Sequence, residues 1–223
     1  MQICPSILEH NIDNYFKTID KLSSFFNWFQ LDFTDGEYVK NKTANFFDFI
    51  KKTPNNQSLI TNIYFDFHLM VKNYQEIINK LNDFLKLKKL KIKNVFIHYD
   101  LKPKKDLLYD NKNQFIIGLV LNPDDQVKNL AYDYDINNIK AIQIMSVYPG
   151  AQGNPFIVNS IKKIEQLRQL GYRYKIFLDG AINDKTIDII KSQKFLPDVI
   201  CPGSYFSKAK KEEINEKIKN LIK

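Results

Sequence analysis

Two aspartates and one histidine stand at the ends of three separate apolar, strand-like runs of this chain. Asp32 precedes a turn that contains Gly36, whereas His68 and Asp179 end two later runs. A single acid or imidazole at a strand end is commonly a loop cap, but three in different segments are hard to explain as independent caps. We therefore interpret the three side chains as one site, in which carboxylates and an imidazole could transfer protons or bind a metal ion.

The elements that must position this site alternate between strand and helix along the whole chain. Apolar runs predict strands at 2–4, before Asp32, and at 63–69, 94–98, 115–121, 142–147, 174–178 and 199–201. Helical periodicity predicts helices at about 11–25, 44–52, 74–85, 157–170 and 185–191, with a closing helix toward 222. Eight strand-then-helix units predict an α/β fold, a (β/α)8 TIM barrel formed by one domain over 1–223. In such a barrel the carboxyl ends of all strands meet at one mouth.

Composition limits the kinds of binding partner and the cellular compartment that we expect for this protein. The chain has 33 Lys and Arg against 25 Asp and Glu, which gives a net charge of +8, but no basic and aromatic groove motif accompanies the charge. We therefore expect neither a nucleic-acid nor a membrane partner. Cys4 and Cys201 each lie in an apolar run and are expected to be buried thiols on adjacent strands rather than ligands. No signal-like start or membrane-length apolar window is present, which predicts a cytoplasmic protein.

Several ordered segments resemble the ribulose-phosphate 3-epimerase family. The matching segments are Pro5-Ser6-Ile7-Leu8, Leu31-Asp32-Phe33-Thr34-Asp35-Gly36 with Val39 and Asn41, Phe67-His68-Leu69-Met70-Val71, Met145-Ser146-Val147-Tyr148-Pro149-Gly150, Leu178-Asp179-Gly180 and Gly203-Ser204. Each is short, but they follow the family's order over nearly the whole chain and fall on predicted strand ends. The resemblance implies a TIM barrel of the ribulose-phosphate-binding type.

The resemblance also implies an isomerase of the pentose phosphate pathway that interconverts D-ribulose 5-phosphate and D-xylulose 5-phosphate. Inversion at C3 removes a proton on one face of the sugar and returns one on the other, so a base and an acid must flank the carbon. By the family's pattern, Asp32 and Asp179 are these catalytic groups. A divalent metal cation (zinc, iron(II), manganese or cobalt) would stabilise the enediolate, with His68 and both aspartates as ligands.

Substrate contacts follow from the same resemblance. A small phosphorylated ketose is the expected partner, and the likeness implies a homo-oligomer. Barrels often bind phosphate through backbone amides of the loops after the seventh and eighth strands. The expected substrate-binding residues are Ser6, Met70, Met145, Gly150, Gly153, Gly180, Ala181, Gly203 and Ser204.

The chain departs from the family's pattern at two informative positions. Gln30 stands where the family has a histidine metal ligand, and a neutral amide oxygen should weaken a zinc-like site. Ala181 replaces a glycine of the family, and alanine is expected to be tolerated there only with a negative φ. The loop from Gly150 through Ala151 to Asn154 keeps two glycines and could still fold over a ligand.

These departures leave alternatives open. The chain could be a non-catalytic barrel that binds phosphosugars after losing full metal ligation at Gln30, or an epimerase that acts on a ketohexose 6-phosphate. Each residue also has a purely structural interpretation: a histidine at a strand end is often only hydrogen bonded, and Asp35 could simply cap its loop.

Overall fold

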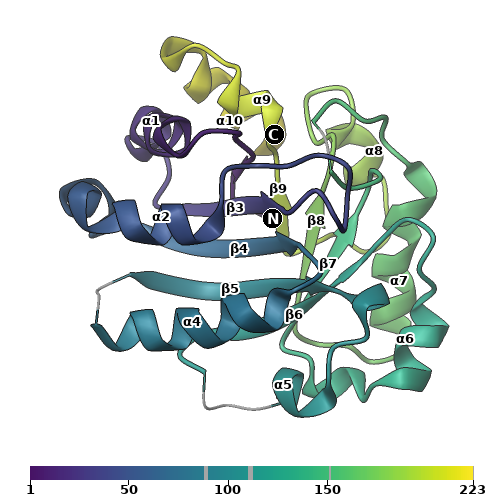
Figure 1. Cartoon of the computed structure of the whole chain (residues 1–223). Coiled ribbons are helices and arrows are strands. Elements are labelled where there is room, and N and C mark those ends of the chain that lie inside the picture. Colours follow the sequence, from purple (N-terminus) through teal and green to yellow (C-terminus); the bar gives the residue numbers. More distant parts are fainter. Residues whose placement is uncertain (88–89, 110–112, 151, 223) are drawn as a thin grey trace.

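A computed structural model describes residues 1–87, 90–109, 113–150 and 152–222 of the chain. Its strands all run parallel in one curled sheet with the order β1-β9-β8-β7-β6-β5-β4-β3-β2, and helices cover the outside (Figure 1). The strands are β1 (Gln2–Ile3), β2 (Ser6–Ile7), β3 (Trp28–Thr34), β4 (Tyr64–Met70), β5 (Lys91–His98), β6 (Ile116–Leu121), β7 (Ala141–Met145), β8 (Lys175–Asp179) and β9 (Val199–Cys201). This architecture confirms the TIM-barrel fold predicted from the strand and helix alternation.

The helices follow the strands in turn. They are α1 (Ile12–Ser23), α2 (Phe46–Lys52), α3 (Gln57–Ile60), α4 (Tyr74–Leu87), α5 (Lys105–Tyr109), α6 (Val127–Asp133), α7 (Lys162–Gln169), α8 (Ile187–Lys191), α9 (Ser204–Ser207) and α10 (Ile214–Ile222). Sequence periodicity did not find the short helices α3, α5 and α6, which have only one or two turns to display a pattern. Among the described residues, no helix is long and apolar enough to cross a membrane.

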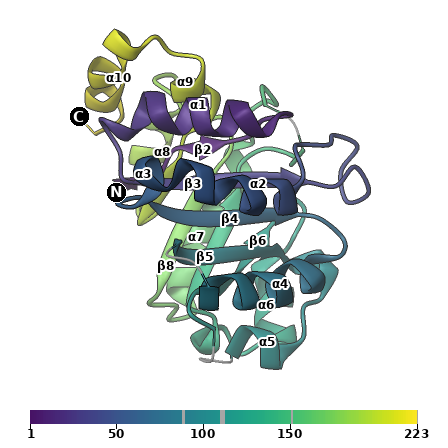
Figure 2. The ribbon, with the colours of Figure 1, turned by 60° about the vertical axis from the view of Figure 1, so that its left-hand side comes forward.

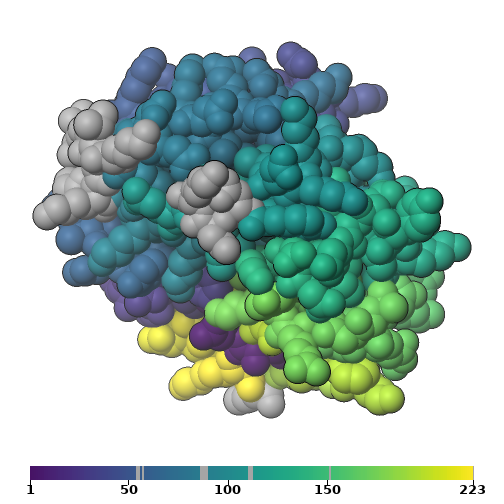
Figure 3. All heavy atoms as spheres, turned by 90° about the horizontal axis from the view of Figure 1, so that it is seen from below, coloured from purple at the N-terminus to yellow at the C-terminus, as the bar shows by residue number. Residues whose placement is uncertain are grey.

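The first strand is divided in two, and its halves close the sheet. β1 pairs with β9, and the Cys4 amide donates to the Ile200 carbonyl oxygen at 2.9 Å. β2 pairs with β3 on the other side, where the Pro5 carbonyl oxygen accepts from the Gln30 amide at 3.0 Å. The division falls at proline, which has no N–H for a ladder hydrogen bond. Seen from below, the first residues, in purple, therefore lie beside atoms of the C-terminal segment, in yellow (Figure 3).

Alternating side chains of each strand separate two apolar cores. In β3, Phe29, Leu31 and Phe33 belong to the large core between the sheet and the helices, whereas Trp28 belongs to the small core inside the barrel. The outer core contains aromatic pairs between α1, α2, β3 and β4, such as Tyr15 and Phe33 with ring centroids 5.4 Å apart. Figure 2 shows α1 and α2 lying across these strands. The polar side chains of β3 therefore face the interior.

Helix α1 illustrates how local sequence fixes an element. Asn11 accepts a hydrogen bond from the Asp13 amide at 2.7 Å and so caps the first turn. The buried positions recur every three or four residues, which places one apolar stripe against the sheet. They are Ile12, Tyr15, Phe16, Thr18, Ile19 and Leu22.

The inner core is filled with the help of one glycine. Phe96 from β5 is fully buried and packs edge-on against Phe177, with ring centroids 4.9 Å apart. A Cβ added at Gly118 of β6 would lie 2.7 Å from the Phe96 ring and 2.9 Å from the Ala141 carbonyl oxygen. Gly118 therefore leaves the space that the Phe96 ring occupies.

We expect Gly118→Ala to lower the free energy of unfolding by about 1–3 kcal/mol, because the added methyl group overpacks a dense interior. Chemical denaturation measures the change. In the double variant with Phe96→Leu, the loss should be smaller than the sum of the two single losses, because the smaller side chain makes room. Additive losses would contradict this account of the contact.

Candidate functional site

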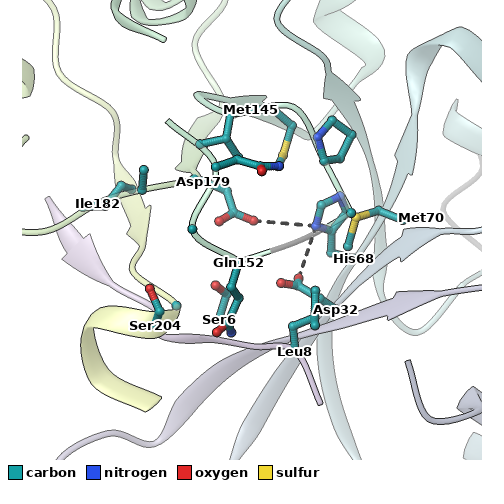
Figure 4. A pocket seen from close by; sticks show the side chains of 18 of the residues that line it. Ser6, Leu8, Asp32, His68, Met70, Met145, Gln152, Asp179, Ile182 and Ser204 are labelled. Atoms are coloured by element: carbon teal, nitrogen blue, oxygen red, sulfur yellow. Dashed lines mark hydrogen bonds and ion pairs between the residues drawn. The ribbon is translucent and has the colours of Figure 1, made fainter. Parts of the chain in front are cut away.

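The register of the parallel strands brings the three predicted site residues together. Asp32 of β3 is the cross-strand neighbour of His68 of β4, and Asp179 ends β8 on the opposite side of the interior. His68 Nδ1 lies 3.2 Å from Asp32 Oδ1 and 3.6 Å from Asp179 Oδ2 (Figure 4). All three side chains are buried. The arrangement presents two carboxylates to one imidazole at the carboxyl ends of the strands.

Gln30 lies directly beneath this group. Its Nε2 donates to Asp32 Oδ1 at 3.0 Å and to Asp179 Oδ2 at 2.6 Å. Its Oε1 accepts a hydrogen bond from Cys201 Sγ at 3.5 Å, so both ends of the amide have partners. Gln30 thus points into the space where the resemblance predicted a histidine ligand, and it bridges the two carboxylates.

His98, at the end of β5, is a member of the site that the sequence analysis missed. Its Nε2 lies 2.9 Å from His68 Nε2, and this hydrogen bond fixes the orientation of the His68 ring. The Tyr38 ring packs on His98 with centroids 4.6 Å apart, and the Tyr38 hydroxyl group donates to Asp100 at 2.9 Å. His98 could have been found from the sequence, because it ends a predicted strand as His68 does.

Gln143 of β7 is the second residue that was missed. Its Nε2 lies 3.2 Å from Asp179 Oδ2, 3.3 Å from His68 Nδ1 and 3.6 Å from Met145 Sδ. The side chain is fully buried, and its Oε1 has no hydrogen-bond partner among the described residues. The available signal was a polar residue inside the otherwise apolar run 142–145.

Burial and charge shift the ionisation of these groups in different directions. Burial raises the pKa of Asp32 to about 6, although the hydrogen bond from His68 opposes this increase. Burial alone would lower the pKa of His68, but its hydrogen bonds with Asp179 and Asp32 outweigh burial and raise the pKa to about 9. Burial lowers the pKa of His98, so this imidazole stays neutral and its Nε2 can accept a hydrogen bond from the protonated Nε2 of His68.

Three ligand atoms fit a divalent cation. One carboxylate oxygen of Asp32, one ring nitrogen of His68 and one carboxylate oxygen of Asp179 all lie within 4.8 Å of one another. A cation bound tetrahedrally at the usual distances of about 2.0–2.2 Å keeps its ligand atoms roughly 3.3–3.6 Å apart, close to the spacing of His68 Nδ1 from the two carboxylates. The donor set is oxygen-rich, which suits metals that accept carboxylates together with imidazole.

A cavity of about 200 Å³ opens above the three residues. All nine predicted substrate-binding residues line it: Ser6, Met70, Met145, Gly150, Gly153, Gly180, Ala181, Gly203 and Ser204. Figure 4 shows Ser6 and Ser204 on the side of the cavity away from His68. Among the lining residues that the structure describes there is no lysine or arginine, so an anion here would depend on neutral N–H and O–H donors. Ala151 of the predicted covering loop lies outside the described residues.

The expectation of a negative φ at Ala181 is wrong. Ala181 has a φ of +50° and follows Gly180, which has a φ of +114°. The Ala181 carbonyl oxygen accepts hydrogen bonds at 2.9 Å from Asn183 Nδ2 and from Thr186 Oγ1. These two bonds hold the turn and offset the left-handed strain of a non-glycine residue.

Asp35 is a loop cap, which is the structural interpretation given to it from the sequence. Its Oδ1 accepts from the amides of Glu37 and Tyr38, both at 2.8 Å, and its Oδ2 accepts from the Lys72 amide at 2.8 Å. The backbone donors lower the pKa of this carboxyl group despite partial burial. Asp35 therefore caps the loop after β3 and ties it to the loop after β4.

We expect His68 of the metal-free protein to titrate near pH 9, because both neighbouring carboxylates favour the imidazolium ion. Asp32→Asn should lower that pKa by about one unit or more. Since the folded pKa lies above the unfolded value of about 6.5, the stabilisation is complete below pH 6.5 and is lost as the pH rises to about 9. NMR titration, assigned with His68→Gln, measures the pKa. Titration of His68 below pH 6.5 would contradict the proposed charge arrangement.

Comparison with solved structures identifies the fold. The tryptophan synthase A-subunit of Pyrococcus furiosus matches with a TM-score of 0.65 and 8% identity, over 99% of this chain and 97% of that one. 3-Hexulose-6-phosphate synthase from Salmonella typhimurium matches with a TM-score of 0.57 and 8% identity, over 99% and 96%. At such low identity these likenesses show a shared barrel and no shared activity.

Comparison of sequences is more specific. A ribulose-phosphate 3-epimerase from Helicobacter pylori (strain J99) is 26% identical over 221 residues, which cover 96% of this chain and 94% of the relative. A ribulose-phosphate 3-epimerase from Schizosaccharomyces pombe is 24% identical over 190 residues, covering 84% and 79%. The model of the ribulose-phosphate 3 epimerase family matches residues 2–206, where all the strands and the site residues lie. The chain belongs to the ribulose-phosphate 3 epimerase family.

Proposed function

We propose that this protein interconverts D-ribulose 5-phosphate and D-xylulose 5-phosphate. Family membership supports epimerisation of a sugar phosphate. The observation that carries the proposal is the pair of buried carboxylates, Asp32 and Asp179, whose oxygens lie within 4.8 Å of each other beneath one cavity. A reaction that removes a proton from one face of a carbon and returns one to the opposite face is served by two such groups.

In this proposal the carboxylates exchange roles with each turnover. One is ionised and takes the C3 proton, and the other is protonated and returns a proton on the opposite face. A pKa of about 6 for Asp32, raised by burial, keeps both protonation states accessible near neutral pH. Met70 and Met145 line the cavity and are themselves almost fully buried, so they would exclude water from the reacting carbon.

Asp32, His68 and Asp179 would hold a divalent cation such as zinc, iron(II), manganese or cobalt. When bound, the cation supplies positive charge that stabilises the negative oxygens of an enediolate. His98 would keep the His68 ring oriented through the Nε2 hydrogen bond at 2.9 Å. Gln30 would hold Asp32 and Asp179 at a fixed separation.

The phosphate would lie against the loops that follow β8 and β9. Gly180 and Ala181 follow β8, while Gly203 and Ser204 follow β9, and all four line the cavity. A Cβ added at Gly203 would lie 2.9 Å from Ser6 Oγ, so a side chain there would crowd this part of the cavity. Backbone amides in these loops would bind the phosphate oxygens.

We expect wild-type protein to exchange the C3 hydrogen of D-ribulose 5-phosphate with solvent deuterium, and Asp179→Asn to slow conversion to D-xylulose 5-phosphate by about 10²–10⁴-fold. An amide can neither take nor return the C3 proton, and inversion needs a carboxyl group on each face. NMR measures the exchange and the conversion, and binding of the sugar phosphate by Asp179→Asn should persist because the phosphate contacts are elsewhere. Asp48→Asn, on the exposed face of α2, is the matched control and should leave exchange and conversion unchanged.

The same assay decides between the proposal and its alternatives. Faster exchange with allulose 6-phosphate than with ribulose 5-phosphate would assign the protein to ketohexose 6-phosphate. Exchange with neither sugar, after loading in turn with zinc, iron(II), manganese and cobalt, would reject the epimerase proposal. Binding without exchange would then favour a non-catalytic phosphosugar-binding barrel.

We expect Gln30→His to raise the affinity for zinc by about 10 to 100-fold, because an imidazole nitrogen is a better zinc ligand than a neutral amide. Titration of the metal-stripped protein against a competing chelator measures the affinity. Gln166→His, on the exposed side of α7, controls for adding a surface imidazole. An unchanged zinc affinity would show that position 30 does not contribute a ligand.

A further inference from the structure

The side-chain amide of Gln143 has a buried oxygen whose position is not explained by the hydrogen bonds that its nitrogen donates. Its side chain enters the barrel from β7, between the strands that carry His68 and Asp179. The amide nitrogen is nearly equidistant from two candidate ligand atoms, at 3.2 Å from Asp179 Oδ2 and 3.3 Å from His68 Nδ1. The amide oxygen is buried without a partner among the described residues. An unsatisfied buried oxygen beside a metal-binding group requires a physical reason.

Rotation of the terminal amide of Gln143 by half a turn provides a physical reason for the unpaired oxygen. The oxygen and nitrogen of a glutamine are nearly equal in size, and rotation about the last side-chain bond exchanges them. After the exchange, the oxygen would lie at about the same distances from Asp179 Oδ2 and His68 Nδ1. Those distances, 3.2 and 3.3 Å, are close to the lower end of the separation of roughly 3.3–3.6 Å between atoms that share one cation.

The two glutamines of the site differ in this respect. Gln30 uses both ends of its amide, because its nitrogen bridges Asp32 and Asp179 and its oxygen accepts from Cys201 Sγ. Turning Gln30 would break these contacts. Gln143 uses only its nitrogen, so a half-turn gives up the contacts of that nitrogen with Asp179 and Met145 but no partner of its oxygen. Gln143 is therefore the amide better placed to present oxygen to a cation.

We propose that Gln143 binds the cation through its amide oxygen as a further ligand beside Asp32, His68 and Asp179. The proposal rests on the metal site of the proposed function. It adds a neutral oxygen from β7 to a set in which position 30 is a glutamine and supplies no imidazole. With two carboxylates and one amide oxygen, the site suits manganese(II), which prefers oxygen ligands more strongly than zinc does.

Calorimetric titration of manganese(II) into metal-stripped protein, without any sugar phosphate, tests the proposal. Gln143→Leu removes the oxygen at similar size and should weaken binding by about 10 to 100-fold. Gln143→Glu keeps an oxygen and adds a charge, so it should bind manganese at least as tightly as wild type. Gln166→Leu, on the exposed side of α7, is the matched control and should bind as wild type does.

The opposite result is equally informative. If the amide N–H faces the cation site in solution, it opposes the ion, and Gln143→Leu should bind manganese as tightly as wild type or more tightly. Either outcome overturns the proposal. Thermal unfolding of each metal-stripped variant checks that the barrel is intact.

A crystal structure of manganese-loaded wild type gives a test that does not depend on any variant. An oxygen of Gln143 within about 2.3 Å of the ion supports ligation, and a distance beyond about 3 Å excludes it. Neither measurement uses turnover. Absence of Gln143 ligation therefore leaves the epimerase assay untouched, and failure of that assay leaves the binding result standing.

Discussion

The strict alternation of side chains along parallel strands is the constraint on which the rest of this structure depends. Every second residue of a closed sheet must enter a narrow interior, where neighbouring strands bring their side chains into contact. Register then makes Asp32 and His68 neighbours and places Met145 beside Asp179. The site is thus a layer of the barrel interior, held by the same hydrogen-bond ladders that form the fold.

That layer must balance charge where water is scarce. Two carboxylates so close together repel each other, and burial makes each ionised form more costly. Hydrogen-bond donors on several sides stabilise the two carboxylates. The His68 imidazole lies between both acids, the Gln30 amide bridges them, and the Gln143 amide donates to Asp179. A divalent cation at this position would stabilise the two carboxylates with more positive charge than these donors supply. A cation bound there would take the place of a proton on His68 Nδ1.

Sequence alone located much of this arrangement because the strand ends are marked by a change from apolar to titratable residues. Asp32, His68 and Asp179 were found in this way, and the segments around them pointed to the family. His98 and Gln143 were not singled out, since their importance comes from contacts with His68 across strands far apart in sequence. The backbone of Ala181 could not be inferred either, because its positive φ depends on side chains of the following turn, Asn183 and Thr186.

The closure between the first and last strands has a consequence for the reactivity of the two thiols. Cys4 and Cys201 are free and buried where β1 meets β9, and burial raises the pKa of Cys4 to about 11 and that of Cys201 well above its ordinary value. Only a thiolate that reaches solvent reacts with an alkylating reagent. These thiols are therefore shielded while the seam is closed, and the rate at which they become alkylated reports how often the first strand detaches from the barrel.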